Sequence, residues 1–145
     1  MSIRHNKRWG RAGQAVVEFA LVLPIFLLLI LGAVDFGRAY YRLHLLTNAV
    51  RVGARAGSLP GSTEEELENI VGSILEDSGL TEEFVLDINV TDIDGNERSG
   101  GLSEAEEGDR IQVIIEQDFT IIGIGFIPGT DGTLTLSSSC TFRHE

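Results

Sequence analysis

The chain begins with a long apolar segment and then changes to a regular alternation of apolar and polar positions. Ala15 to Val34 form twenty consecutive residues with one charge, Glu18, and one proline, Pro24. Twenty helical residues reach about 30 Å, which is the thickness of the hydrocarbon core of a bilayer. A helix that is apolar on all faces cannot be wrapped by so small a protein. The pattern therefore predicts a transmembrane helix over residues 15–34.

A helical repeat of apolar positions continues beyond this segment to about Ala56. Steps of three and four residues separate its members, which are Phe36, Ala39, Leu43, Leu46, Val50 and Gly53. This spacing places them on one side of a helix. The stripe packs either on the chain's own domain or against the helices of other subunits, and the sequence leaves both open. Pro24 is a candidate kink in the long helix.

Residues 58–145 have the pattern of a separate α+β domain. A second, amphipathic helix, which Ser62 or Thr63 can cap and Gly79 can end, has one apolar face; the face consists of Leu67, Ile70, Val71, Ile74 and Leu75. Apolar and polar residues then alternate over about 84–91, 110–119 and 133–143, which predicts three strands. The expected architecture is one long helix, a second helix and a small, mainly antiparallel sheet. Cys140 falls on the predicted core face of the last strand.

Charge is segregated along the 145 residues, although the net charge is -11. Residues 1–55 carry eight Lys/Arg and two acids, whereas residues 56–145 carry three Arg and twenty acids. A basic, apolar first third is thus joined to an acidic remainder, unlike an ordinary cytosolic enzyme. The acidic balance argues against nucleic acid as a partner.

Glu18 is the one charge within the apolar segment. A carboxylate at the centre of a membrane span costs about 2.5–3.5 kcal/mol, and less near its end. Glu18 therefore either reaches the membrane interface or has a cationic partner. Cleavage after Gly13 would place a new α-amino group on Gln14, four residues away. That amine could neutralise Glu18 in its own chain or in a neighbouring one.

Two simpler uses of the apolar segment remain open. A secretory signal peptide also has a basic start and an apolar stretch, but no A-x-A-like cleavage site follows Val34. A plain membrane anchor without further processing fits as well. Four Lys/Arg precede the span and four Arg follow it within about twenty residues, so the positive-inside rule does not decide the orientation.

The N-terminal third resembles a known family. Gly13 to Phe19, GQAVVEF, looks like a prepilin peptidase site, with a small residue before the cut, then Glu and Phe as fifth and sixth residues after it. The longer stretch 13–57 is similar to the TadE-like minor pilins (pseudopilins) of the tight-adherence, or Flp, pilus systems. Its matching pieces are GQAVVEFALVLP, the DFGR step at 35–38 and NAVRVGAR at 48–55. The segment 134–143 also resembles the closing strand of that family, except at Cys140.

This resemblance implies a precursor in the cytoplasmic (inner) membrane with its N-terminus in the cytoplasm. Residues 1–13 would be a basic leader that prepilin peptidase removes between Gly13 and Gln14. Residues 14–57 would be the long helix, with its transmembrane part at 15–34, and residues 58–145 an acidic extracytoplasmic domain. Glu18 and Phe19 would serve assembly and charge pairing. Membrane lipid, other pilin or pseudopilin subunits and the inner-membrane assembly platform are the implied partners. The chain is much longer than typical major Flp pilins, which favours a minor component.

The sequence offers little chemistry of other kinds. Asp92, Asp94 and Asn96 are a weak calcium candidate, because the glycine is misplaced for an EF-hand and no Glu follows at the right distance. The three histidines have no neighbouring residues that suggest a triad or a metal site. We therefore expect no cofactor and no enzyme activity. The rival function is a single-pass, membrane-anchored extracellular binding module, adhesin-like, that does not assemble into a filament.

Overall fold

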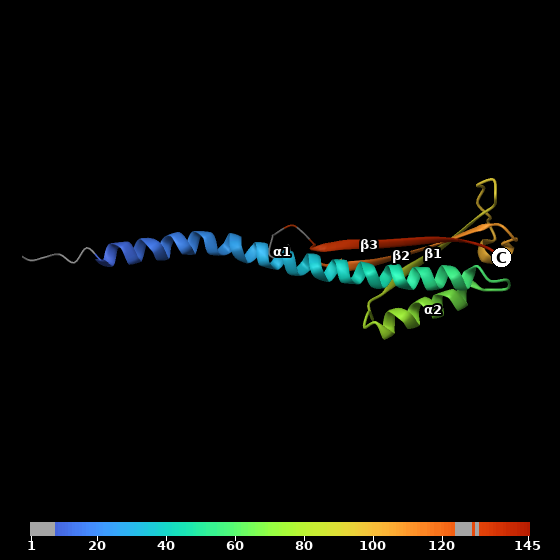
Figure 1. Ribbon diagram of the computed structural model, residues 1–145, viewed down its shortest axis with the longest axis horizontal. Helices are drawn as coiled ribbons and strands as arrows, with labels where there is room; N and C mark the ends of the chain where they lie inside the picture. Colours follow the sequence, from blue (N-terminus) through green and yellow to red (C-terminus); the bar gives the residue numbers. More distant parts are fainter. Residues whose placement is uncertain (1–7, 124–128, 130) are drawn as a thin grey trace, which may run out of the picture.

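A computed structural model describes the backbone of residues 8–123, 129 and 131–145, with side chains from residue 13 onward. Helix α1 (Arg8–Gly57) is the longest element, and its first half extends as an arm from a domain built around its second half (Figure 1). The domain adds helix α2 (Glu64–Asp77) and three strands, β1 (Phe84–Thr91), β2 (Arg110–Thr120) and β3 (Thr133–Arg143). This arrangement confirms the predicted α+β class.

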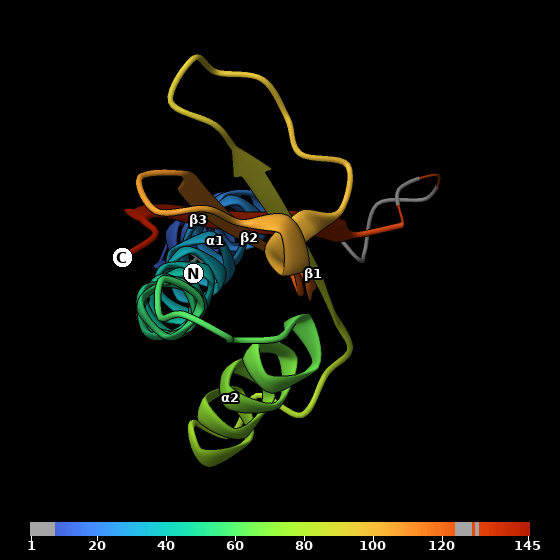
Figure 2. The same cartoon turned by 90° about the vertical axis from the view of Figure 1, so that its right-hand side faces the viewer.

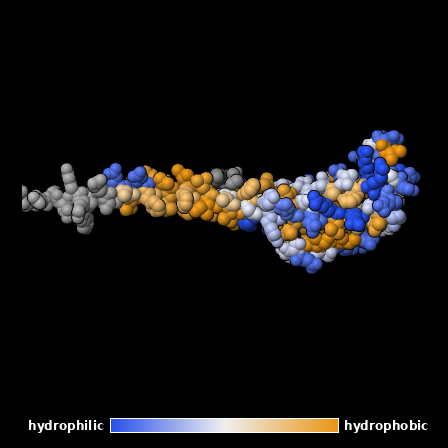
Figure 3. Space-filling view, in the orientation of Figure 1, coloured by the Kyte–Doolittle hydropathy of each residue, from blue (hydrophilic) through white to orange (hydrophobic). Residues whose placement is uncertain are grey.

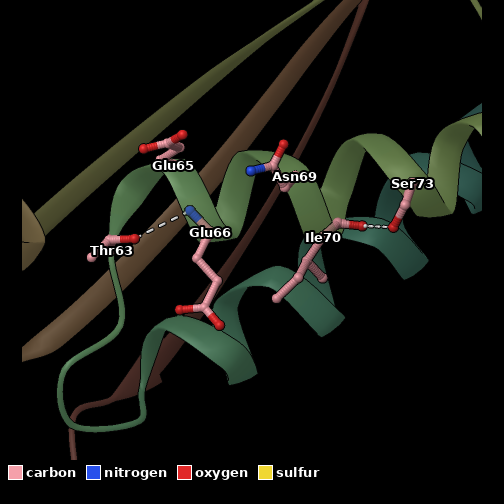
Figure 4. A pocket seen from close by; sticks show the side chains of 6 residues that line it. All are labelled: Thr63, Glu65, Glu66, Asn69, Ile70 and Ser73. Atoms are coloured by element: carbon pink, nitrogen blue, oxygen red, sulfur yellow. Dashed lines mark hydrogen bonds between the residues drawn. The ribbon is translucent and has the colours of Figure 1, made fainter.

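Helix α2 begins and ends with residues suited to its termini. The hydroxyl of Thr63 accepts a hydrogen bond from the backbone N–H of Glu66 at 3.3 Å (Figure 4). At the other end, Gly79 has φ 81° and its N–H donates to the carbonyl of Glu76, while Leu80 N–H donates to the carbonyl of Leu75. These two bonds form a Schellman motif, which requires a left-handed residue that glycine supplies without strain.

The sheet is antiparallel throughout, with strand order β1-β2-β3. Each strand pairs with the next along the chain, so that Leu86 lies opposite Ile115 and Val113 lies opposite Cys140. Along β2, side chains alternate between buried and more exposed positions, because α1 and α2 both lie on the same side of the sheet (Figure 2). The other side carries no helix among the described residues.

Between β1 and β2 the chain forms a long connection that projects beyond the sheet (Figure 2). It contains the 3-10 helix η1 (Gly101–Glu104), whose Leu102 is buried. The Arg98 guanidinium ties the connection together by donating to Asp109 at 3.2 Å and to Glu106 at 2.8 Å. Nothing in the sequence pattern indicated this contact between the partly buried Arg98 and the buried Asp109.

The core of the domain lies between α1, α2 and the sheet. It contains Leu46, Ala49, Val50 and Ala54 of α1, Leu67, Val71 and Leu75 of α2, and Leu80, Val90, Leu102, Ile111, Val113 and Ile115 from the rest of the domain. Cys140 is half-buried and packs against this core. The second half of α1 is therefore part of the domain's own interior.

The two helices approach each other closely at two glycines of α1. A Cβ on Gly53 would lie 2.7 Å from Cγ2 of Val71, and one on Gly57 would lie 2.8 Å from Cδ2 of Leu67. Real Cβ atoms do not approach carbon this closely, since contacts are favourable at about 3.5–4.0 Å. Glycine at these positions lets α1 and α2 pack side by side.

Candidate functional site

The exposed arm is the first candidate site. Residues 13–34 are exposed except for the partly exposed Leu23 and Leu31, and the apolar surface in Figure 3 runs along this arm and fades where the domain starts. Among the described residues, α1 is the one helix long and apolar enough to cross a membrane by length and composition. Such an apolar surface is unfavourable in water and favourable in a bilayer or against other apolar helices.

The predicted processing and pairing residues all lie on this arm. Gly13, Gln14 and Glu18 are exposed within α1, and Phe19 is 65% exposed. Pro24 also lies inside the helix. No side chain described in the structure forms an ion pair with Glu18. The fold thus leaves this carboxylate accessible to a partner from outside the domain.

The apolar stripe of α1, which is the candidate inter-subunit face, is exposed at its start and buried where the domain begins. Leu46 and Val50 are fully buried in the chain's own core, Ala39 is partly buried, and Leu43 is 36% exposed. Phe36 is 74% exposed. This difference arises because the sheet and α2 cover only the later turns of the stripe. The earlier turns stay uncovered by the described domain.

A polar contact fastens the domain to α1 just after the apolar segment. The Asp35 carboxylate accepts a hydrogen bond from the backbone N–H of Gly123 at 2.6 Å and one from Arg38 at 3.0 Å. Asp35 is 5% exposed, although it lies on a helix whose neighbours are mostly exposed. The chain leaving β2 is therefore held against α1 at the base of the domain.

Arg42 forms a second connection between α1 and the domain. Its guanidinium makes a two-pronged ion pair with Glu82, with one of the two N···O distances at 2.7 Å. The guanidinium carbons of Arg38 and Arg42 lie 5.1 and 5.2 Å from the ring centroid of Phe119, within the range of cation–π attraction. Arg42 lowers the pKa of Glu82 below its ordinary value by donating these hydrogen bonds. Two of the basic residues that follow the span are thus bound within their own chain.

An apolar groove lies beside this junction. It has a volume of about 400 Å³ and is lined by Leu28, Gly32, Phe36, Phe119, Ile121 and Leu134, among others. The groove borders an apolar loop at 121–129, of which residues 124–128 are outside the described residues. The loop's described end at Ile122 is 46% exposed.

The weak calcium candidate is a hydrogen-bonded turn. The Asp92 carboxylate accepts from the backbone N–H groups of Asp94 and Asn96 and from the Asn96 side chain, at 2.8–2.9 Å. These donors, the Asn96 side chain foremost, lower the pKa of Asp92. Within the described ranges, no group of three or more His, Cys, Asp or Glu side chains is placed to hold a metal ion.

Asp109 is a buried carboxylate that sequence reasoning did not single out. It is 2% exposed and accepts from the backbone N–H of Glu106 at 2.8 Å, and Arg98 donates to it as well. The Glu106 N–H, followed by Arg98, lowers the pKa of Asp109 below its ordinary value of 3.8. Its own backbone carbonyl accepts from His144 N–H at 2.7 Å, which binds the end of β3 to the connection.

Comparison with known proteins gives one match. Residues 13–55 match the family model described as TadE-like protein. No curated protein and no solved structure matches the chain. The match covers the arm and most of the core half of α1, and it confirms the resemblance seen in the sequence of that segment.

Proposed function

We propose that this chain, whose segment 13–55 is TadE-like, is a membrane-anchored structural subunit of a tight-adherence type pilus. It is made as a precursor, and prepilin peptidase cuts it between Gly13 and Gln14. The mature chain then enters a helical assembly as a minor pilin or pseudopilin. The acidic domain faces outward, on the extracytoplasmic side.

The observation that carries this proposal is the exposed apolar arm continuous with the domain's core helix. Twenty apolar residues cannot remain in water, so the arm lies in lipid or among similar helices. Because residues 13–30 are exposed, apart from the partly exposed Leu23, in the part of the chain that the structure describes, this stretch of the arm is available for such packing. A structural role fits these features, and the TadE-like match points in the same direction.

Glu18 supplies the driving force for assembly in this mechanism. In lipid its carboxylate has no partner and carries a desolvation penalty. In a bundle of like helices it meets the α-amino group that cleavage creates on Gln14, in the same chain or in a neighbour. Pairing within one chain is available in lipid as well, so the driving force comes from pairing with a neighbouring chain, where an unpaired carboxylate becomes a paired one. Phe19, beside it, packs into the bundle.

Processing is tested by intact mass and N-terminal peptide mapping of the protein from its native membrane. We expect a chain that begins at Gln14, with methylation or cyclisation of that residue allowed for. Replacing Gly13 by a bulky residue is expected to block the cut, because the peptidase accepts a small residue there. A chain that keeps residues 1–13 would instead favour the anchored, adhesin-like binding module, and a start beyond Val34 would indicate a secreted domain.

The role of Glu18 is tested separately from processing. Glu18→Ala is expected to leave cleavage intact and to reduce the amount of this protein in the pilus fraction that is sheared from the cell surface. Glu116→Ala, an exposed carboxylate on β2, is the matched control and should assemble normally. Normal assembly of Glu18→Ala would refute the pairing mechanism.

A further inference from the structure

The four arginines that follow the apolar segment on α1 fall into two groups. Arg38 pairs with Asp35, and Arg42 pairs with Glu82, both inside the same chain. Arg51 and Arg55 are exposed, and neither has an ion pair with the part of the chain that the structure describes. Carboxylates of the same chain, Asp35 on α1 and Glu82 in the acidic domain, therefore pair with the first two arginines, whereas the second two are left exposed.

Membrane lipid is too far away to be the partner of the second pair. Arg51 lies seventeen residues beyond Val34 along one continuous helix, which corresponds to about 25 Å. The headgroup layer extends only about 5–8 Å beyond the hydrocarbon core, and salt screens exposed charges over about 8 Å. A partner for Arg51 and Arg55 must then be a macromolecule that stands at their height above the membrane.

The outer side of α2 has the complementary charge. Leu67, Val71 and Leu75 point into the core, and the exposed positions carry Glu65, Glu66, Glu68 and Glu76. No Lys or Arg occurs in this helix. Figure 4 shows the Glu65 and Glu66 side chains near the start of α2, where they point to different sides of the helix.

The two faces lie at the same height and on opposite sides of the molecule. Gly53 of α1 packs on Val71, and Gly57 packs on Leu67, so α2 runs alongside the turns that carry Arg51 and Arg55. Each arginine is two residues from Gly53, or about 200° around the helix. Copies anchored side by side in one membrane would therefore bring the arginines of one to the α2 of the next without an axial shift.

We propose that the outward face of α1 at Arg51 and Arg55 binds the outward, acidic face of α2 in a second copy of this chain. This contact joins two different faces, so it can repeat from copy to copy rather than stopping at a pair. The proposal rests on the proposed function in that it takes the copies to be anchored in parallel. Charge complementarity is what selects the second copy over other occupants.

Cross-linking in the membrane tests the geometry. Two full-length copies with different tags are co-expressed, both with Cys140→Ser, one with Arg55→Cys and the other with Glu65→Cys. A short bis-maleimide should join the two tags efficiently. Arg143→Cys, which replaces another exposed arginine on β3, is the matched control for Arg55→Cys and should join poorly. Equal cross-linking of the two pairs, or none with Arg55→Cys, would overturn the proposal.

Exchanging the charges tests whether the contact is electrostatic. Association is measured by co-purification of the two tags at low salt. The double change Arg51→Glu with Arg55→Glu should reduce self-association about five-fold or more, because attraction becomes repulsion. Glu65→Lys with Glu66→Lys should do the same. Mixing the two variants should restore association, because each altered face then meets a complementary one. Circular dichroism confirms that both variants fold, and a milder double variant, Arg51→Gln with Arg55→Gln, which should also lower self-association, keeps the test valid if they do not.

The outcomes separate this inference from the proposed function. Restored association upon mixing supports the contact, even if pilus assembly proves independent of it. Pilus assembly that survives all charge changes, with no cross-link, overturns the contact and leaves the proposed function standing. Loss of assembly in both variants without mutual restoration would point to a different protein as the partner and would also overturn it.

Discussion

Gly53→Ala is expected to separate helix propensity from helix packing. A Cβ at this position would lie 2.7 Å from Cγ2 of Val71, which is fully buried. Alanine favours the helix over glycine by about 1 kcal/mol, but overpacking a filled core costs about 1–3 kcal/mol. The net effect on the free energy of unfolding should be a loss of about 0–2 kcal/mol.

Gly37→Ala is the matched control, because a Cβ there meets nothing within 4 Å. It should raise the free energy of unfolding by up to about 1 kcal/mol, so the two substitutions should differ by about 1–3 kcal/mol. The assay is urea unfolding of the full chain in a mild detergent, followed by circular dichroism. In the double variant with Val71→Ala, the Gly53→Ala penalty should shrink. If Gly53→Ala stabilises the protein as much as Gly37→Ala does, the close approach of α1 and α2 is not as described.

Two other predictions concern the same domain. Leu46→Ala should lower the free energy of unfolding by about 2–5 kcal/mol, because Leu46 is fully buried, whereas Leu43→Ala, 36% exposed, should cost much less in the same urea titration; equal losses would contradict the intrachain packing. Asp109→Asn should make the stability of the protein depend less on pH in the acidic range. A carboxylate whose pKa is lowered in the folded state stabilises the protein above its ordinary pKa of 3.8, and this stabilisation is lost as the pH falls through the pKa of the folded state. Thermal unfolding between pH 6 and 2 would measure this, with the exposed Asp77→Asn as the control, and an unchanged dependence on pH would refute it.

Local signals in the sequence predicted most of the fold. The apolar run and the three-and-four spacing gave α1, and the alternation at 133–143 gave β3 with the bounds observed. Gly79 ends α2 because its left-handed backbone suits a Schellman motif, and the residue type alone indicates this. These features depend on neighbours within a few residues, so one sequence is enough to find them.

Contacts between distant segments could not be predicted in the same way. Asp35 and Gly123 are separated by 88 positions, and Arg42 and Glu82 by 40. Nothing in the periodicity distinguishes Arg42, which pairs inside the chain, from Arg51, which does not pair with the described residues. The same holds for the apolar stripe: Phe36 and Leu46 have the same spacing pattern, but only Leu46 is covered by the sheet and α2. Burial depends on where other elements end, which a helical repeat does not specify.

The unbroken course of α1 couples the rotation of the anchor to that of the domain. The helix runs without interruption from the exposed arm to the core residues at 46–54, so the side of the arm that faces a neighbour fixes the direction in which α2 and the sheet face. Inserting one residue after Val34 would turn the domain by about 100° and raise it by about 1.5 Å, while four residues would turn it by only about 40° and raise it by about 6 Å. The number of residues between the apolar segment and the core residues of α1 therefore determines which faces of adjacent subunits meet, and a change of one residue alters this more than a change of a full turn.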